Sequence, residues 1–449
     1  MTRYMSRCID RSIERDLGIF GAVLIQGPKW CGKTTTAQRF AESSLSLSDP
    51  AGDFAALQLA RIDPAQAIVG ATPRLIDEWQ EEPKLWDAIR FECDRRTGEP
   101  GQFLLTGSAT PNDADQPMHS GIGRISRLRM ETMTLAELGV SSGAVSLESL
   151  LNGCPIKAAL GSINGIADIA DLLCRGGWPQ AAGKTTADAM RISAAYIDGV
   201  CESDVSRVDG VKRDPEKVRA LLSSLARNES TLAGEKSLEK DLGGDVSRST
   251  LRRYTDALRR IHIIDDIPAW HPALRSPVKL RQSAKRHLAD PSLAVALLGA
   301  NPESLASDPK TLGLLFESLV LHDLKVYAAA NDSSVSHYHD ADDLEVDAVI
   351  HRRDGTWIAV ESKTRKSADS PRHLQTCFDS SANLSSVARD HPWPSSSSSG
   401  SACRPIQRPR ALSLPPLTHS RPSAALHAPR ACLLGELAAV ELGVEAACR

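Results

Sequence analysis

A glycine-containing segment near the N-terminus has the residue types that bind nucleotide phosphates. Residues 27–34 match the pattern G-x-x-x-x-G-K-[ST], directly after the apolar run at 22–25 and at the start of a helical pattern. Glycines let backbone N–H groups turn toward phosphate oxygens, and a helix N-terminus adds the positive end of its dipole. The phosphate-binding residues expected here are Gly27, Pro28, Lys29, Trp30, Cys31, Gly32, Lys33, Thr34 and Thr35. A glycine turn without function is the alternative, and it leaves the order of strand, loop and helix unexplained.

Four residues around this loop suggest ATP and Mg²⁺ chemistry. Lys33 should reach the β and γ phosphates, and Thr34 should ligate Mg²⁺. The apolar run at 74–76 ends in Asp77 and Glu78. Asp77 would hold the same Mg²⁺, and Glu78 would deprotonate the attacking water. Acidic residues also cap helices at such turns, so capping is the alternative for both.

Two further polar positions are candidates for catalysis. Ser108 follows the apolar run at 102–105 and would lie beside the γ phosphate, although a plain turn explains the same residues. Arg124 is the first of three closely spaced arginines, any of which could neutralise transition-state charge, in cis or across a subunit interface. Solvated arginines are the alternative.

The elements that must position these residues predict an α/β domain over residues 1–140. Apolar runs at 22–25, 74–76 and 102–105 alternate with amphipathic stretches. That alternation is typical of a largely parallel sheet covered by helices, as in P-loop NTPases.

The rest of the chain changes character twice. Residues 141–300 lose the strand rhythm and predict a helical region, and residues 301–365 predict a small α/β module with a helix and a hairpin across Asp354-Gly355. No lysine follows Lys366, and the remaining sequence is rich in Ser, Arg and Pro. Such composition buries little apolar surface, so residues 366–449 are expected to be a disordered tail.

Composition narrows the class of protein. A chain of 449 residues favours several domains, and a formal charge of -3 excludes a polybasic coat for nucleic acid. Ten cysteines lack zinc-site spacing, which predicts reduced thiols and a cytoplasmic location. No apolar run is long enough to span a membrane, so no membrane partner is expected.

The order of these motifs resembles the AAA-like ATPases of bacteria and archaea whose C-terminal part is a domain of unknown function. The resemblance covers about residues 1–365 and rests on Gly27 to Thr34, Leu75-Ile-Asp-Glu-Trp-Gln80, Leu105-Thr-Gly-Ser108, and Gly123-Arg124 leading into Met133-Thr-Leu-Ala-Glu137. It implies that Lys33, Thr34, Asp77, Glu78, Ser108 and Arg124 are the ATP-site residues. Glu131 departs from the pattern, because a basic residue is expected there.

The resemblance implies a winged helix in the second half, followed by a restriction-endonuclease-like part. Residues 247–260 support the first independently, since Leu251, Tyr254 and Leu258 share one helical face. The opposite face carries arginines that suit DNA phosphates: Arg248, Arg252, Arg253, Arg259 and Arg260. An ordinary solvated face or a contact between domains is the alternative.

A nuclease-like arrangement is suggested by Glu317, Asp347, Glu361 and Lys363. In this E…D…E-x-K pattern, carboxylates of adjacent strands share Mg²⁺ and the lysine assists the attacking water. A degenerate fold and coincidence remain alternatives. The Ser/Arg/Pro-rich sequence begins soon after Lys363, so the nuclease-like module is expected to be truncated.

Together these features predict an Mg²⁺-dependent ATPase that couples nucleotide state to a DNA or protein partner, and they are compatible with an oligomer. One alternative is a DNA-binding regulator that binds ATP without significant turnover. Another is an ATP-gated nuclease.

Overall fold

The structure is a computed structural model, and it describes residues 4–110, 118–141, 143, 145–153, 163, 165–244, 246–271, 282–339, 345–362 and 432–435. Lys363 and the predicted tail, apart from residues 432–435, lie outside the described residues. The side chain of Glu361 and those of residues 432–435 also lie outside them.

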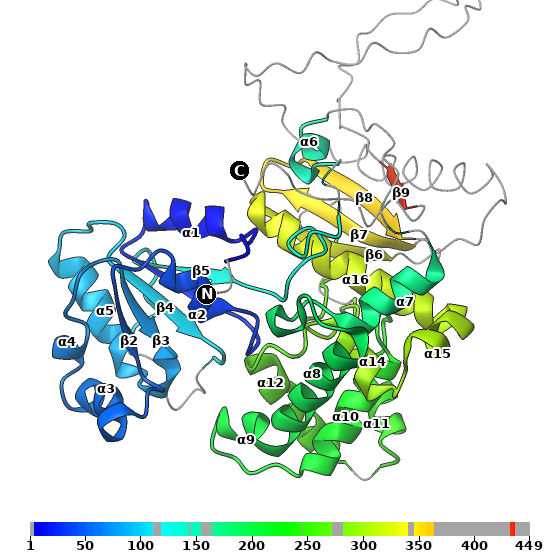
Figure 1. Ribbon diagram of the computed structural model, residues 1–449, viewed down its shortest axis with the longest axis horizontal. Helices are drawn as coiled ribbons and strands as arrows, with labels where there is room; N and C mark the ends of the chain where they lie inside the picture. The colour runs from blue at the N-terminus through cyan, green and yellow to red at the C-terminus, as the bar shows by residue number, and fades with distance from the viewer. Residues whose placement is uncertain are drawn as a thin grey trace, which may run out of the picture.

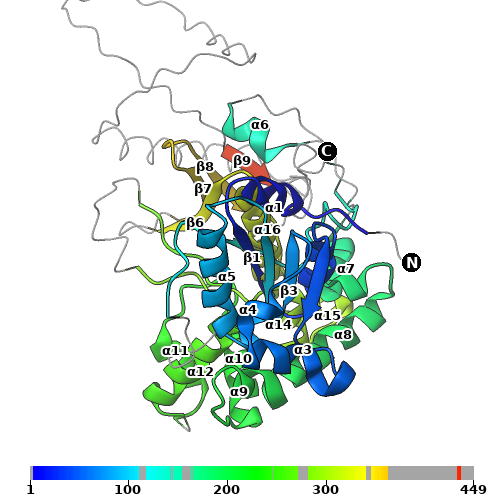
Figure 2. The ribbon, with the colours of Figure 1, turned by 90° about the vertical axis from the view of Figure 1, so that its left-hand side faces the viewer.

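Five parallel strands form the N-terminal sheet in the order β2-β3-β4-β1-β5. The strands are β1 (Ala22–Gln26), β2 (Ser43–Ser46), β3 (Arg74–Asp77), β4 (Phe103–Gly107) and β5 (Ile125–Arg129). The helices are α1 (Asp10–Leu17), α2 (Lys33–Gln38), α3 (Ala51–Ile62), α4 (Pro64–Ala67), α5 (Lys84–Arg95) and the 3-10 turn η1 (Trp79–Glu81). Helices lie on both faces of the sheet (Figure 2). The predicted α/β domain is confirmed, and β2 and β5 add to the three predicted strands.

Alternation along β1 divides the core of this domain into two layers. Val23 and Ile25 pack with Ile13 of α1 on one face of the sheet. Ala22 and Leu24 pack on the other face, in the cluster that includes α5. Successive side chains of a strand point to opposite faces, so β1 is buried on both sides, as central strands of parallel sheets are. This anchors the loop that follows β1.

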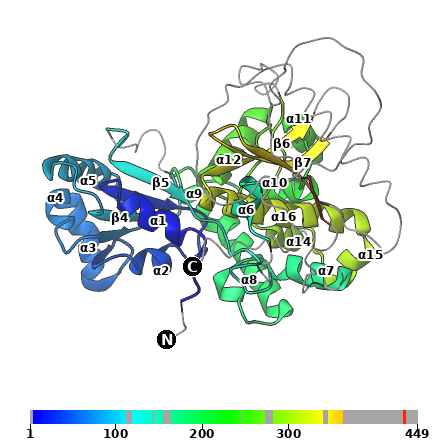
Figure 3. The same ribbon diagram turned by 90° about the horizontal axis from the view of Figure 1, so that it is seen from above.

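The middle of the chain is helical, as predicted. Its elements are α6 (Leu147–Leu151), α7 (Ile166–Arg175), η2 (Pro179–Ala181), α8 (Thr186–Gly199), the π-helical turn η3 (Val200–Asp204), α9 (Val205–Arg207), α10 (Pro215–Arg227), α11 (Glu235–Asp241), α12 (Arg248–Arg260), α14 (Pro291–Leu297) and α15 (Pro302–Ser307). After α10, α11 and α12 the chain forms two antiparallel bridges, Ile264 with Leu288 and Ile267 with Lys285. Figure 3 shows this region beside the N-terminal sheet.

The C-terminal module has a long helix against a small sheet. Its elements are α16 (Pro309–Ala330), β6 (Ser333–His339), β7 (Glu345–Arg352), β8 (Trp357–Ser362) and β9 (Cys432–Gly435). The strands β6, β7 and β8 are antiparallel neighbours, and β9 pairs parallel with β8. The predicted helix and hairpin are confirmed. The prediction of a tail without structure did not include β9, which forms from four residues of that segment.

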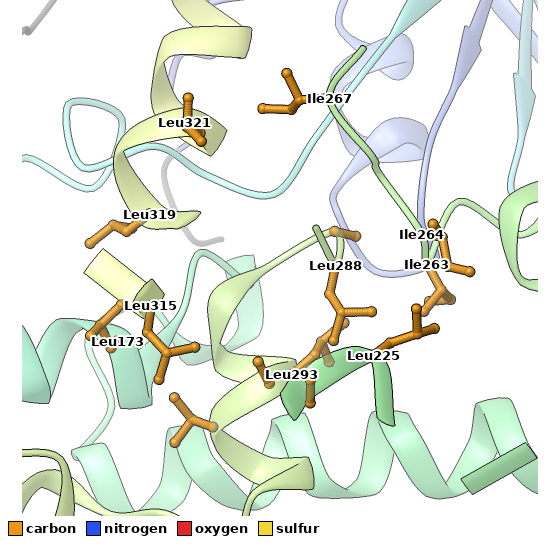
Figure 4. Close-up of a cluster of buried hydrophobic side chains, with 14 of the residues drawn as sticks. Leu173, Leu225, Ile263, Ile264, Ile267, Leu288, Leu293, Leu315, Leu319 and Leu321 are labelled. Atoms are coloured by element: carbon orange, nitrogen blue, oxygen red, sulfur yellow. The ribbon is translucent and has the colours of Figure 1, made fainter. Parts of the chain in front are cut away.

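One apolar core joins the helical region to the C-terminal module. Leu173 of α7, Leu225 of α10 and Leu293 of α14 belong to the same buried cluster as Leu315 and Leu319 of α16 (Figure 4). The two regions therefore pack as one body, beside the N-terminal sheet (Figure 1). Within the described part of the chain, no helix is long and apolar enough to cross a membrane.

Candidate functional site

The loop between β1 and α2 has the backbone that phosphate binding requires. Gly32 has φ +103°, a left-handed conformation that favours glycine. A Cβ at Gly27 would lie 2.0 Å from the backbone oxygen of Met130, so only glycine fits there. Lys33 then begins α2. The loop is thus tightly curved between a buried strand and a helix N-terminus, an arrangement that aims N–H groups at anions.

Lys33 lies folded over this loop. Its side chain is buried, and Nζ donates to the backbone oxygens of Gly27 at 3.0 Å and Pro28 at 2.8 Å. Two backbone oxygens thus hold the ammonium group at the phosphate loop. A phosphate oxygen offers Lys33 a stronger, charge-assisted partner in the same place.

Thr34 and Asp77 meet next to the loop, as the sequence predicted for a shared Mg²⁺ site. The Thr34 hydroxyl donates to Asp77 Oδ1 at 2.7 Å, and the buried Thr106 hydroxyl donates to the same oxygen at 2.5 Å. A hydroxyl and a carboxylate are hard oxygen ligands of the kind Mg²⁺ prefers, with phosphates and waters completing its octahedron. The described residues contain no group of three His, Cys, Asp or Glu suited to a metal.

Glu78 is oriented by two neighbours. Its backbone is left-handed, with φ +58°, and its N–H donates to Thr106 Oγ1 at 3.2 Å. Ser108 donates to Glu78 Oε2 at 3.0 Å, and Gln80 Nε2 donates to the same oxygen. The structure thus brings Ser108 together with Glu78 as expected. The sequence analysis gave Gln80 no role, although this residue ends the segment 75–80 on which the family resemblance rests.

Three residues of the predicted phosphate loop have side chains that contact other parts of the protein. Lys29 Nζ lies 2.6 Å from Asp204 of η3, and the ring of Trp30 lies 5.6 Å from that of Tyr196 of α8. The Cys31 thiol is buried and donates to the backbone oxygen of Met130. Lys29 and Trp30 thus tie the loop to the helical region, and Cys31 ties it to the end of β5, so any phosphate contacts of these residues would come from their backbone. Thr35 has an exposed side chain.

Arg124 does not lie at this site. It precedes β5 at the edge of the sheet where the strands begin, whereas the phosphate loop follows the opposite end of β1. Its guanidinium pairs with Asp94 of α5 at 2.8 Å. The expectation that Arg124 acts in cis is therefore wrong, because a whole strand separates it from Lys33. Arg129, at the other end of β5, pairs with Gln26 in the sheet and lies beside the loop.

The predicted nuclease residues meet a lysine that sequence reasoning missed. Lys285 Nζ lies 2.5 Å from Glu317, 2.8 Å from Glu345 and 3.7 Å from Asp347. Burial, together with the charge of Asp347, raises the pKa of Glu317 to about 7 despite Lys285. Asp347 also accepts from the backbone N–H of Ser362 at 2.8 Å. The carboxylates of α16 and β7 do come together, but around an internal cation.

The basic face of α12 is partly neutralised. Leu251 and Leu258 are buried, as the helical pattern predicts. On the exposed face, Arg248 and Arg252 pair with Glu235 of α11 at 3.2 and 3.0 Å. Arg259 pairs with Asp256 and Asp266, whereas Arg253 donates to the Thr250 hydroxyl.

Comparison with known proteins finds matches to three separate segments of the chain. Residues 20–139 match the family model of an AAA domain, and residues 312–391 match a domain of unknown function, DUF4143. Residues 166–304 match a further domain of unknown function, DUF8612. The fold and the loop thus define the P-loop class for the N-terminal part, and the chain carries an AAA domain over residues 20–139 and a C-terminal domain of unknown function over residues 312–391.

The similar proteins include two mycobacterial ones. The uncharacterized proteins Mb2031c of Mycobacterium bovis and Rv2008c of Mycobacterium tuberculosis are each 28% identical over 335 residues, 73% of this chain and 67% of theirs. Among solved structures, the Walker-type ATPase PABY2304 of Pyrococcus abyssi has a TM-score of 0.40 at 12% identity, covering 66% of this chain and 96% of its own. The Holliday junction branch migration motor RuvB of Thermotoga maritima has a TM-score of 0.27 at 19% identity, covering 58% and 89%.

Proposed function

We propose that this chain binds ATP with Mg²⁺ at the loop over 27–34 and hydrolyses it. The observation that carries the proposal is the connected set of side chains at the ends of β3 and β4. Asp77 accepts from Thr34 at 2.7 Å, while the adjacent Glu78 accepts from Ser108 at 3.0 Å. These two neighbouring carboxylates thus have different partners. Asp77 is suited to binding a metal ion, and Glu78 is suited to accepting a proton from water.

Each residue then has a defined task. Thr34 and Asp77 hold Mg²⁺, which when bound neutralises charge on the β and γ phosphates. Lys33 exchanges the oxygens of Gly27 and Pro28 for phosphate oxygens. Glu78, kept in place by Ser108 and Gln80, accepts the proton of the attacking water.

Two variants test this assignment. Lys33→Ala removes the ammonium group and should abolish tight ATP binding, whereas Glu78→Gln should bind ATP normally and fail to hydrolyse it. ATP affinity and phosphate release, measured for both variants and the unaltered protein with Mg²⁺, decide the matter. An unaltered protein that neither binds nor hydrolyses ATP would refute the proposal, and unchanged turnover in Glu78→Gln would remove Glu78 from the role of base.

We further propose that nucleotide state is coupled to DNA through α12. Support comes from the order α10, α11, α12 followed by antiparallel bridges, the layout of a winged helix, with α12 in the position of a recognition helix. Duplex DNA should raise the rate of ATP hydrolysis if this coupling exists. DNA binding with no effect on turnover would instead favour the regulator that binds ATP without significant hydrolysis.

An ATP-gated nuclease has less support. Lys285 lies among Glu317, Glu345 and Asp347, where its ammonium group already neutralises the carboxylates. We propose that these residues stabilise the C-terminal module rather than cut DNA. Nicking of plasmid DNA that requires both Mg²⁺ and Glu317 would contradict this role.

A further inference from the structure

His262 is a buried histidine two residues after the C-terminal end of α12. Its side chain is 4% exposed, and its backbone is left-handed, with φ +60°. The Arg129 guanidinium lies 3.2 Å from Nδ1 of the ring. A histidine in an uncommon backbone conformation, buried against an arginine of another domain, invites a functional explanation.

The arginine fixes which ring nitrogen carries the proton. A guanidinium can only donate, so His262 Nδ1 must accept from Arg129, and the proton of the neutral ring lies on Nε2. Burial, then the charges of Arg129 and Lys33, lower the pKa of His262 to about 3. The ring is therefore neutral at pH 7, and Nε2–H is a fixed donor.

This donor has no acceptor within the described part of the protein. His262 Nε2 is buried and lacks a hydrogen-bond partner there. Leaving a buried donor unpaired costs free energy, so such groups usually have a partner in the working state of a protein. A ligand bound at this place would supply the missing acceptor.

The position of His262 identifies that ligand. Arg129 ends β5 beside Gln26, the last residue of β1 before the phosphate loop. Lys33 is close enough for its charge to lower the pKa of His262. Nearby, the N–H of Thr110, two residues after Ser108, donates to the backbone oxygen of Arg260 at 3.0 Å. The end of α12, which belongs to the helical region, therefore lies next to the proposed nucleotide site.

We propose that His262 Nε2–H donates a hydrogen bond to the terminal phosphate of ATP, so that the end of α12 distinguishes ATP from ADP. This inference rests on the proposed ATP binding. The loop backbone encloses the inner phosphates and Lys33 reaches the β and γ phosphates from that same side, so a donor from another region meets the γ phosphate from the opposite side. The basic helix α12 is thereby connected to the γ phosphate through the turn that follows it, which gives nucleotide state a route to the arginines proposed to face DNA.

Three substitutions of His262 test the proposal. Leucine removes the donor, asparagine tolerates the left-handed backbone but is too short to place its amide at Nε2, and glutamine can place an N–H close to the Nε2 position. Affinities for ATP and ADP with Mg²⁺ are measured for each, with thermal unfolding in the absence of nucleotide as the check on folding. His262→Leu and His262→Asn should lose about ten-fold in ATP affinity, the size of one hydrogen bond to a charged group. Their ADP affinity should change less than about two-fold, and His262→Gln should restore ATP affinity to within about three-fold.

The outcomes separate this inference from the ATP site itself. Equal losses for ATP and ADP, or no loss for either nucleotide, would overturn the role of His262 while leaving ATP binding by the unaltered protein intact. If the unaltered protein binds neither nucleotide, the proposed function fails and this inference fails with it. If His262→Leu does not fold, the comparison of His262→Asn with His262→Gln decides the question.

Discussion

At the scale of single residues, the orientation of Glu78 depends on two side chains, one directly after β4 and one in the turn η1. Its left-handed backbone turns the carboxylate toward Ser108, at the end of β4, and toward Gln80, in η1. A general base must be held within hydrogen-bonding reach of the water that it deprotonates. The serine hydroxyl and the glutamine amide thus provide the orientation, while the carboxylate provides the chemistry.

Replacing Ser108 by alanine should therefore affect the rate more than the affinity. Loss of a hydroxyl donor to a carboxylate leaves Glu78 less well oriented, so kcat for ATP should fall about ten-fold. ATP affinity should stay within about two-fold, because the phosphate loop is untouched. Steady-state kinetics and nucleotide titration measure the two quantities. Ser44→Ala, on the exposed side of β2, is the matched control and should change neither. A normal kcat in Ser108→Ala would contradict the orienting role.

Residues close together in sequence were predictable, and residues brought together by folding were not. Lys33, Thr34 and the Asp77-Glu78 pair follow from local patterns whose spacing is set by one loop or one strand end. Arg129 and His262 are 133 positions apart, and no local pattern connects them. Arg124 and Arg129 belong to the same cluster of arginines in the sequence. The strand β5 lies between them, so the two residues are at opposite ends of that strand.

At the scale of elements, α12 is an amphipathic helix whose charges are balanced by its neighbour α11. Glu235 begins α11 and accepts from both Arg248 and Arg252. These pairs are exposed and contribute little to stability. They do, however, reduce the positive potential that DNA would meet, so Glu235 limits the affinity of this face for phosphate.

Opposite changes in DNA binding are expected from Glu235→Gln and Arg253→Gln. The first releases Arg248 and Arg252, so duplex affinity should rise and its log-log salt dependence should become steeper. The second removes a phosphate contact, so affinity should fall and the slope should decrease by about 0.9. Affinity titrated against salt for both variants tests this, and Lys240→Gln on α11 is a charge control. Identical curves for all proteins would mean that α12 does not face DNA.

The sequence predicted the geometry of α12 but not its electrostatic state. The apolar positions at helical spacing were enough to place Leu251 and Leu258 inside, because burial follows periodicity. The ion pairs depend on how α11 crosses α12, and a crossing of two helices depends on packing rather than on the pattern of either one. For the same reason, β5 and β9 were not predicted, because their pairing partners lie far away in sequence.

At the scale of the whole molecule, buried polar side chains link the three regions. Thr132, just after β5, donates to Asp290 at 2.6 Å and lies 2.9 Å from the ring of His322 on α16. Asp290 caps α14, so one carboxylate joins the N-terminal domain to the helical region. Lys285 makes the corresponding link from the bridge after α12 to α16 and β7. Such buried links make the relative placement of the regions specific, and no single region's sequence pattern predicts them.

Replacing Lys285 by methionine should destabilise the protein in a manner that depends on pH. Lys285 is 1% exposed, and without its ammonium group three carboxylates, on Glu317, Glu345 and Asp347, would face one another. Removing one partner of a buried ion pair costs about 3–5 kcal/mol of unfolding free energy at pH 8. Lys310→Met, at an exposed lysine of α16, the helix that carries Glu317, is the matched control and should have little effect.

Lowering the pH should restore most of the unfolding free energy lost in Lys285→Met. The direction of this pH dependence follows from the pKa of Glu317. Burial and Asp347 already raise this pKa to about 7, above the ordinary value of 4.5 that the unfolded chain has. A carboxyl group with a raised folded-state pKa contributes stability that is complete below the unfolded value and is lost as the pH rises through the folded value. Without Lys285 the folded-state pKa must rise further, so Lys285→Met should be much closer to the unaltered protein at pH 5 than at pH 8. Chemical unfolding at both pH values measures the difference. An equal loss at both would mean that Lys285 acts through packing of its aliphatic chain and not through its charge.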